Sequence, residues 1–195
     1  HLRAKMYTAL NRNEEAIEAE KKSQELEPFA GPAGMSFIYY RVRRYDDAIR
    51  EGLLLLETKP NDLDVHEQLW EAYRRKGLGK EAAEHLEKVL QLSGDKASAE
   101  AIRHQFERGG YRAVALWQLN YYKAQATKQY VSPVDLAVLS AQLGNREETL
   151  ALLEEGYRQH SPGLLWIQID PAFDFLHSDD RYRSIIQGIG LPPTY

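Results

Sequence analysis

The sequence predicts an all-α protein in which antiparallel helix pairs repeat along the chain. Three blocks that open at Ala16, Ala48 and Ala82 superimpose without gaps, and these alanines lie 32 and 34 residues apart. Each block follows a short turn, and each turn follows another amphipathic stretch, so the repeating unit is helix, turn, helix, turn. A chain of 195 residues is long enough for one globular domain or for an elongated array. The alanine spacing favours the array.

The composition excludes several classes of protein. Hydrophobic residues make up 43% of the chain and charged residues 28%, which argues against disorder. The net charge is −4, so a general phosphate-binding surface is not expected, and no nucleic acid should contact this segment. Because there is no cysteine, a disulfide, a Cys-ligated zinc site and a thiol nucleophile are excluded. The longest aliphatic run, Leu53–Leu56, is too short for a membrane-spanning segment.

The repeat divides the chain into about four and a half units and a tail. The expected boundaries are 1–28, 29–60, 61–94, 95–129 and 130–160, followed by a capping segment at 161–195. In the first helix of each of the first two units a small residue precedes a tyrosine by three positions, as Ala4 with Tyr7 and Ser36 with Tyr39. Small side chains let the two helices of a pair approach closely, and Pro28 or Pro60 ends the unit.

The later units and the tail are less regular. In the unit 95–129, the alanine at the start of the second helix is either Ala113 or Ala115, and the sequence does not fix the repeat register between these two. In 130–160, Ser132 and Pro133 are typical of a helix N-cap and first turn. Ser178 is expected to cap a last helix that ends at glycines. The apolar face of that helix would seal the open end of the array with Tyr182, Ile185, Ile186 and Ile189.

These repeats resemble the tetratricopeptide repeat (TPR) family, which combines a small residue and a Tyr in the first helix with an Ala opening the second helix and a Pro at the exit. The resemblance implies a right-handed TPR superhelix of antiparallel helix pairs, with a concave and a convex side and a C-terminal capping helix. Trp70 departs from the family, because its position usually holds Gly or Ala. Gly52 replaces an aromatic residue of the preceding unit, so we expect the indole of Trp70 to fill the void.

The tail carries a narrower resemblance. The tail is similar to the end of TPR regions in bacterial multidomain signalling proteins at Trp166 and in the segments 170–176 and 178–182. Such regions follow a CadC-like winged-helix DNA-binding domain, a Ser/Thr kinase domain or an adenylate cyclase domain. The resemblance therefore implies a protein-interaction or signal-sensing module of a larger bacterial regulator. A transcriptional regulator is the leading hypothesis, and the regulatory region of a kinase or cyclase is the alternative.

No motif indicates catalysis, a cofactor or a metal. His66-Glu67 begins like a zinc-protease helix, but Trp70 stands where the second histidine belongs. The other histidines lie on different helices and turns, so surface or capping roles are expected for all of them. The stretch 77–80 lacks the remaining residues of a phosphate-binding loop and fits a turn between helices. We therefore expect no enzyme activity, catalytic residue, cofactor or metal.

Two basic clusters at the ends of consecutive first helices provide the candidate binding residues. The structural alternative is that these cations complement the helix dipoles. By the register of the family, the concave groove would be lined by Phe37, Tyr40, Arg41, Glu67, Glu71, Arg74 and Arg75. Aromatic area and bidentate Arg contacts suit an extended or helical peptide. We expect charge reversal at Arg41 and Arg74 together to abolish binding without unfolding the protein.

The expected partner is a protein or peptide in this groove. A further hypothesis is self-association into a homodimer through an apolar edge of the truncated first unit. The first methionine is Met6 and a helical pattern begins at residue 1, which indicates a fragment of a longer protein. The cytoplasm is slightly favoured as its compartment. The periplasm is the alternative if the parent protein has an upstream membrane helix.

Overall fold

The computed structural model describes residues 1–26 and 33–190, and within these ranges all regular structure is helical, which confirms the all-α prediction. Pro28 and residues 191–195 of the expected capping segment lie outside the described residues. The elements are α1 (Leu2–Ala9), α2 (Asn13–Leu26), α3 (Ala33–Arg41), α4 (Tyr45–Thr58), α5 (Leu63–Arg75), α6 (Gly79–Leu92), α7 (Lys96–Ala126), α8 (Pro133–Gln142), α9 (Arg146–Arg158), the 3-10 turns η1 (Pro162–Trp166) and η2 (Pro171–Leu176), and α10 (Asp180–Ile189). They form two compact units, 1–114 and 115–195.

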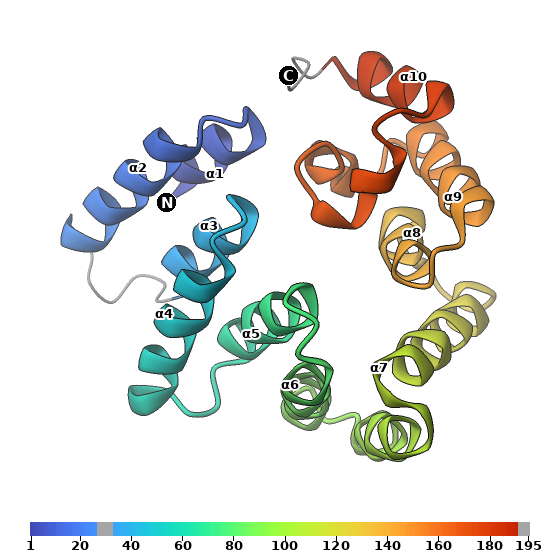
Figure 1. Ribbon diagram of the computed structural model, residues 1–195, viewed down its shortest axis with the longest axis horizontal. Coiled ribbons are helices and arrows are strands. Elements are labelled where there is room, and N and C mark those ends of the chain that lie inside the picture. The colour runs from blue at the N-terminus through green and yellow to red at the C-terminus, as the bar shows by residue number, and fades with distance from the viewer. Residues whose placement is uncertain (27–32, 191–195) are drawn as a thin grey trace. The chain divides into compact units, whose positions relative to one another are not determined.

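In the first unit, helices pair with their chain neighbours and also pack in a row. Helix α1 packs on α2, α3 on α4, and α5 on α6, and α3 additionally contacts both α1 and α5 (Figure 1). The small residues predicted at the helix contacts are fully buried: Ala4, Ala16, Ser36, Ala48 and Ala82. Such residues let helix axes come close enough for side chains to interlock. The odd-numbered helices therefore form a continuous set of neighbours within this unit.

The turn inside each helix pair has the same geometry four times. Three residues separate α1 from α2, α3 from α4, α5 from α6, and α8 from α9. The middle residue is left-handed in every case, with φ of 56° at Asn11, 64° at Arg43, 73° at Gly77 and 78° at Gly144. The last turn residue donates its N–H to a carbonyl five positions earlier, which belongs to Tyr7, Tyr39, Tyr73 and Ser140 in chain order. This bond closes the helix end. The turn predicted at 77–80 is confirmed at Gly77 and Leu78, whereas Gly79 and Lys80 already begin α6.

Trp70 does not occupy the space beside Gly52, so that expectation is wrong. A Cβ atom at residue 52 would lie 2.8 Å from Cδ2 of Leu69, and its three nearest atoms all belong to Leu69. The neighbouring leucine thus fills the gap that a glycine leaves in α4. Trp70 instead donates its Nε1–H to the hydroxyl of Tyr111 at 2.5 Å.

Tyr111 reaches Trp70 because α7 is kinked. Gly109 and Gly110 leave helical geometry, and Gly110 combines φ of 63° with ψ of −162°. Only glycine adopts that backbone conformation readily. The break redirects the chain at Tyr111, whose Cβ lies close to Gly79 at the start of α6. The kink therefore connects the predicted fourth unit to α5 and α6.

In the second unit, the tail is part of the hydrophobic core. Phe173 and Leu176 of η2 are fully buried with Leu150 and Leu153 of α9. Helix α10 packs on α9 through the predicted apolar face, with Tyr182 and Ile185 buried and Ile186 and Ile189 partly buried. Gly190 ends α10 in the left-handed conformation, as expected. The N-cap prediction at Ser178 is wrong, because Asp179 caps the helix.

No helix in the two described ranges combines the length and apolarity that crossing a membrane requires.

Candidate interaction site

The seven predicted groove residues lie on two helices that contact each other. Three of them belong to α3 and four to α5, and both helices are in the first unit. Tyr40 is buried, and the other six are partly exposed: Phe37, Arg41, Glu67, Glu71, Arg74 and Arg75. The structure therefore brings these residues onto adjacent helices, but their side chains differ in what they contact.

Tyr40, Glu71 and Arg74 form a polar link between α3 and α5. The Tyr40 hydroxyl donates to Oε2 of Glu71 at 2.9 Å, and Arg74 forms an ion pair with the same carboxylate oxygen. The Arg74 side chain is only 5% exposed. Burial acts to lower the pKa of Arg74, but the Glu71 carboxylate together with Tyr40 and Tyr111 more than offsets it, so this pKa is raised and the guanidinium stays charged. Arg74 therefore fixes the Glu71 carboxylate, its neighbour on α5, where Tyr40 of α3 can donate to it.

The burial of Arg74 changes how the groove must be tested. A glutamate at position 74 would lie beside Glu71 in a site that excludes water, so charge reversal there would destabilise the fold. The joint reversal of Arg41 and Arg74 stays a prediction, but the burial of Arg74 makes unfolding the expected result of reversing that residue. Arg41 is the better position, because it is partly exposed and its guanidinium lies over the rings of Phe37 and Tyr40, at 5.3 and 5.5 Å from their centroids.

Glu67 is a partly buried carboxylate one turn before Glu71. Burial raises its pKa, and the negative charges of Asp64 and Glu71 raise it further. It forms neither a hydrogen bond nor an ion pair through its side chain with the described residues. Acidic side chains therefore dominate the first turns of α5, whereas Arg74 and Arg75 lie at its end.

Two residues of this region were missing from the sequence prediction. Lys5 of α1 places its ammonium 5.2 Å from the centroid of the Phe37 ring, on which Arg41 also lies. Tyr111 is held by Trp70, and burial raises its pKa although the Arg74 cation opposes this. The adjacent Gly109 and Gly110 were a sequence signal for the kink that delivers Tyr111. Nothing in the sequence paired Lys5 with Phe37, because that contact depends on how α1 packs on α3.

The buried His66 contacts the partly exposed His85, and the sequence did not predict this pair. His66 is 6% exposed, so a surface or capping role is wrong for this residue. Its Nε2 lies 3.1 Å from the carbonyl oxygen of Pro60, and its Nδ1 lies 2.8 Å from Nδ1 of His85. A carbonyl can only accept, so His66 carries its proton on Nε2 and His85 donates from Nδ1. The pair joins α5 to α6.

The histidine pair predicts a loss of stability in mild acid. Burial, with a smaller contribution from His66, lowers the pKa of His85 from 6.5 to about 4. The unfolded chain therefore binds the proton more readily, and the free energy of unfolding should fall as pH decreases from about 6.5 towards 4. Urea denaturation at several pH values measures this dependence. The His85→Gln variant should show a shallower slope, and His104→Gln, at an exposed histidine, should follow the parent.

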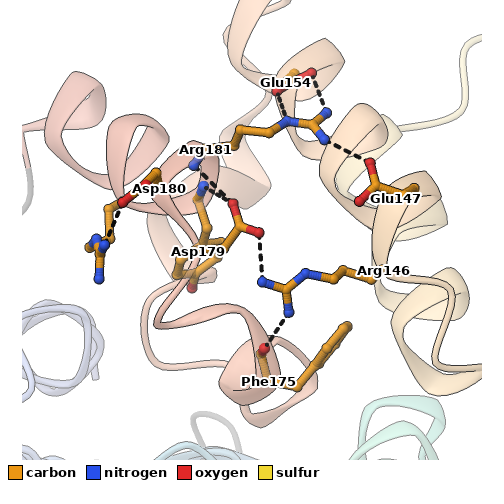
Figure 2. Close-up of polar contacts among 9 residues, drawn as sticks. Arg146, Glu147, Glu154, Phe175, Asp179, Asp180 and Arg181 are labelled. Atoms are coloured by element: carbon orange, nitrogen blue, oxygen red, sulfur yellow. Dashed lines mark hydrogen bonds and ion pairs between the residues drawn. The ribbon is translucent and has the colours of Figure 1, made fainter.

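In the second unit, ion pairs connect α10 to α9. Figure 2 shows Arg181 of α10 between two glutamates of α9. Its guanidinium donates to both carboxylate oxygens of Glu154, at 2.7 and 3.0 Å, and to Glu147 at 2.9 Å. These groups are exposed to solvent, where ion pairs contribute little to stability. They orient α10 and form no pocket.

Asp179 has two roles at the start of α10. One carboxylate oxygen accepts from the backbone N–H groups of Arg181 and Tyr182, and the other accepts from Arg146 at 2.6 Å (Figure 2). Arg146 also donates to the carbonyl oxygen of Phe175 at 3.1 Å. Asp179 therefore caps the helix and ties η2 and α10 to the start of α9.

Removal of this cap should lower thermal stability. Asp179→Ala is expected to reduce the melting temperature by several degrees, because two backbone donors lose their acceptor. Ser178→Ala changes the neighbouring position, which makes no cap hydrogen bond, and it should melt like the parent. Thermal melts followed by circular dichroism compare the two variants. Equal melting temperatures would contradict the capping role of Asp179.

The described residues contain no group of three or more His, Cys, Asp or Glu side chains that could hold a metal ion. No protein-family model, curated protein or solved structure matches the chain. A function is therefore argued from the helix packing and from the side chains of the α3 and α5 face.

Proposed function

We propose that this segment is a non-enzymatic, TPR-type protein-interaction module whose α3 and α5 face binds a protein or peptide segment. The observation that carries the proposal is the convergence of aromatic and charged side chains on two adjacent helices. Phe37 and Arg41 lie together on α3, and Glu67 and Arg75 lie on α5, all of them partly exposed. The repeated turn geometry and the buried alanines support an array of helix pairs as the scaffold.

This combination of side chains suits peptide recognition. An aromatic ring supplies a large contact area for a small loss of conformational entropy, and a guanidinium donates two parallel hydrogen bonds to a carboxylate. The link through Tyr40, Glu71 and Arg74 fixes the spacing of α3 and α5, so the exposed side chains are held in place before a partner arrives. Preorganisation of this kind lowers the entropic cost of binding.

Selection from a random peptide library, followed by affinity measurement, tests the proposal. Selected peptides should bind the parent protein, and Arg41→Glu should weaken binding about tenfold or more with an unchanged thermal melt. Lys80→Glu is the matched control, because it makes the same charge change on an exposed side chain of α6. If no peptide is selected, or if Arg41→Glu and Lys80→Glu bind equally well, the α3 and α5 face is not the binding site.

We further propose that the module belongs to a larger bacterial regulatory protein. The support is the similarity of the tail to TPR regions of CadC-like transcriptional regulators, with kinase and adenylate cyclase fusions as the alternative. Sequencing the gene on either side of this segment distinguishes a transcriptional regulator from a kinase fusion and from an adenylate cyclase fusion. A neighbouring winged-helix domain is the expected result.

Self-association is the second candidate function, because α1 exposes an apolar stripe. Leu2, Met6 and Leu10 are spaced four residues apart and are 74%, 60% and 41% exposed. A second copy that covered this stripe would remove it from water. Light scattering should then report a dimer, and Met6→Glu should convert it to a monomer. A parent protein that is monomeric at every concentration measured removes this candidate.

A further inference from the structure

Charge is segregated between the two helices of each of the first two pairs. Residues 1–12, which contain α1 and its turn, hold three basic residues and no acidic one, and the same is true of residues 33–44 around α3. Their partners have the opposite balance, since α2 has five acidic and two basic residues and α4 has four acidic and one basic. A chain whose net charge is −4 therefore carries a basic strip on two adjacent helices, here called the acid-free strip because α1 and α3 contribute no acidic residue to it. The buried carboxylate of Glu20 of α2 lies beside this strip and is paired with His1.

Some of this positive charge is neutralised within the chain. Arg12 forms an ion pair with Glu15, and Arg44 forms one with Asp47, both across a helix-pair turn. Lys5 is different, because it makes no ion pair with the described residues and lies against the ring of Phe37. Arg3 likewise forms no ion pair with the described residues, and it donates to the Tyr7 hydroxyl at 2.8 Å. Arg3 and Lys5 therefore rest on aromatic rings, and the charges of Glu15 and Glu20 act on them from beyond ion-pair distance.

Phe37 is the centre of this strip. Lys5 approaches its ring from α1 at 5.2 Å and Arg41 approaches from α3 at 5.3 Å, and all three side chains are partly exposed. Two cations beside one ring repel each other, and the aromatic quadrupole offsets part of that repulsion. A carboxylate placed between Lys5 and Arg41 would offset the remaining repulsion between these two cations. An apolar group could contact the exposed edge of the Phe37 ring.

We infer that the acid-free strip of α1 and α3, centred on Phe37 between Lys5 and Arg41, binds an acidic segment of a partner protein that carries apolar residues among its carboxylates. This inference rests on the proposed function and names the chemistry of its ligand. Carboxylates match the cations, and an apolar side chain matches the ring.

A protein segment fits this strip better than a nucleic acid does. A nucleic acid presents a continuous line of phosphates, which would also meet the acidic α2 and α4 beside the strip. A peptide can place a few carboxylates on the strip and leave the acidic helices untouched.

The test uses a fluorescein-labelled peptide of Glu, Asp and Leu residues and measures its binding by fluorescence anisotropy. The parent protein should bind it, and binding should weaken as salt screens the charges. Lys5→Glu and Arg41→Glu should each reduce affinity about tenfold or more, whereas Lys80→Glu should not. Lys5→Gln, which removes the charge without adding a new one, serves as the second variant if Lys5→Glu melts early. It should reduce affinity by a smaller factor.

Two comparison probes decide what is recognised. The same peptide with Gln and Asn in place of Glu and Asp should not bind, and a single-stranded DNA oligonucleotide should bind less tightly than the acidic peptide. Equal affinity for the amide peptide, tighter binding of DNA, or no effect of Lys5→Glu and Lys5→Gln would each overturn the inference.

The library selection separates this inference from the proposed function. If the selected peptides lose affinity for the Arg41→Glu variant but contain no acidic residues, the proposed interaction module is supported and the inference of an acidic ligand is refuted. A selection that yields no binding peptide would refute both.

Discussion

Replacement of Arg74 by methionine is expected to lower the free energy of unfolding by about 2–4 kcal/mol. The ion pair with Glu71 is largely buried, since the Arg74 side chain is 5% exposed and that of Glu71 is 22% exposed. Loss of Arg74 leaves the Glu71 carboxylate charged in a poorly solvated site. The free-energy cost of that unpaired charge is larger than the net stabilisation that the intact ion pair provides. Tyr40 still donates one hydrogen bond to Glu71, so the loss should fall short of that for a fully buried charge. Urea denaturation measures the change.

A double variant shows whether the cost comes from the stranded charge. Arg74→Met combined with Glu71→Gln removes both charges and keeps an acceptor for the Tyr40 hydroxyl, so it should regain most of the lost stability. Arg103→Met, on an arginine of α7 whose side chain is 57% exposed, is the control and should cost less. If Arg74→Met is as stable as the parent, the ion pair with Glu71 does not stabilise the fold, and Arg74 would again be a candidate groove residue.

Phe173→Ala should have the largest effect in the second unit, about 3–5 kcal/mol. The ring is fully buried among Leu150, Leu153 and Leu176, so its removal loses transfer free energy and leaves a cavity. Chemical denaturation followed by tryptophan fluorescence monitors this unit through Trp166 and Trp117.

The same 3-10 turn provides the control. Phe175 is two residues further along η2 and 39% exposed, so Phe175→Ala should cost less than about 1 kcal/mol. Only its backbone carbonyl binds Arg146, and the substitution keeps that carbonyl. Equal losses for the two variants would mean that η2 contributes no specific packing to the core and that the tail is an appendage.

The buried alanines and the last apolar face were predictable, because both follow from periodicity. A helix repeats its faces every 3.6 residues, so Ala16, Ala48 and Ala82 mark positions of close approach, and Tyr182 with Ile185 marks a packing face. Both sets are buried in the structure. The three-residue turn at Gly77 was predictable for a similar reason, since a glycine after an amphipathic stretch is typical of a helix end.

The candidate site was predictable only in part. The register of the resembled family assigned Phe37, Tyr40 and Arg41 to the groove, and their spacing of three and four residues agrees with one face of α3. Whether a charged side chain on that face meets solvent or a carboxylate depends on the neighbouring helix. Arg74 therefore reads as a binding residue in the sequence and is buried against Glu71 in the structure.

The sequence by itself determined the helices, their turns and the residues that must be small where helices meet, because these depend on propensity and spacing along one chain segment. Only the tertiary structure decided that Trp70 bonds to Tyr111, that His66 faces His85 and that Lys5 shares the ring of Phe37 with Arg41. The kink in α7 is what brings Tyr111 to Trp70, and each of these contacts joins residues from different helices. Its geometry is set by how those helices pack, and no local pattern encodes that packing.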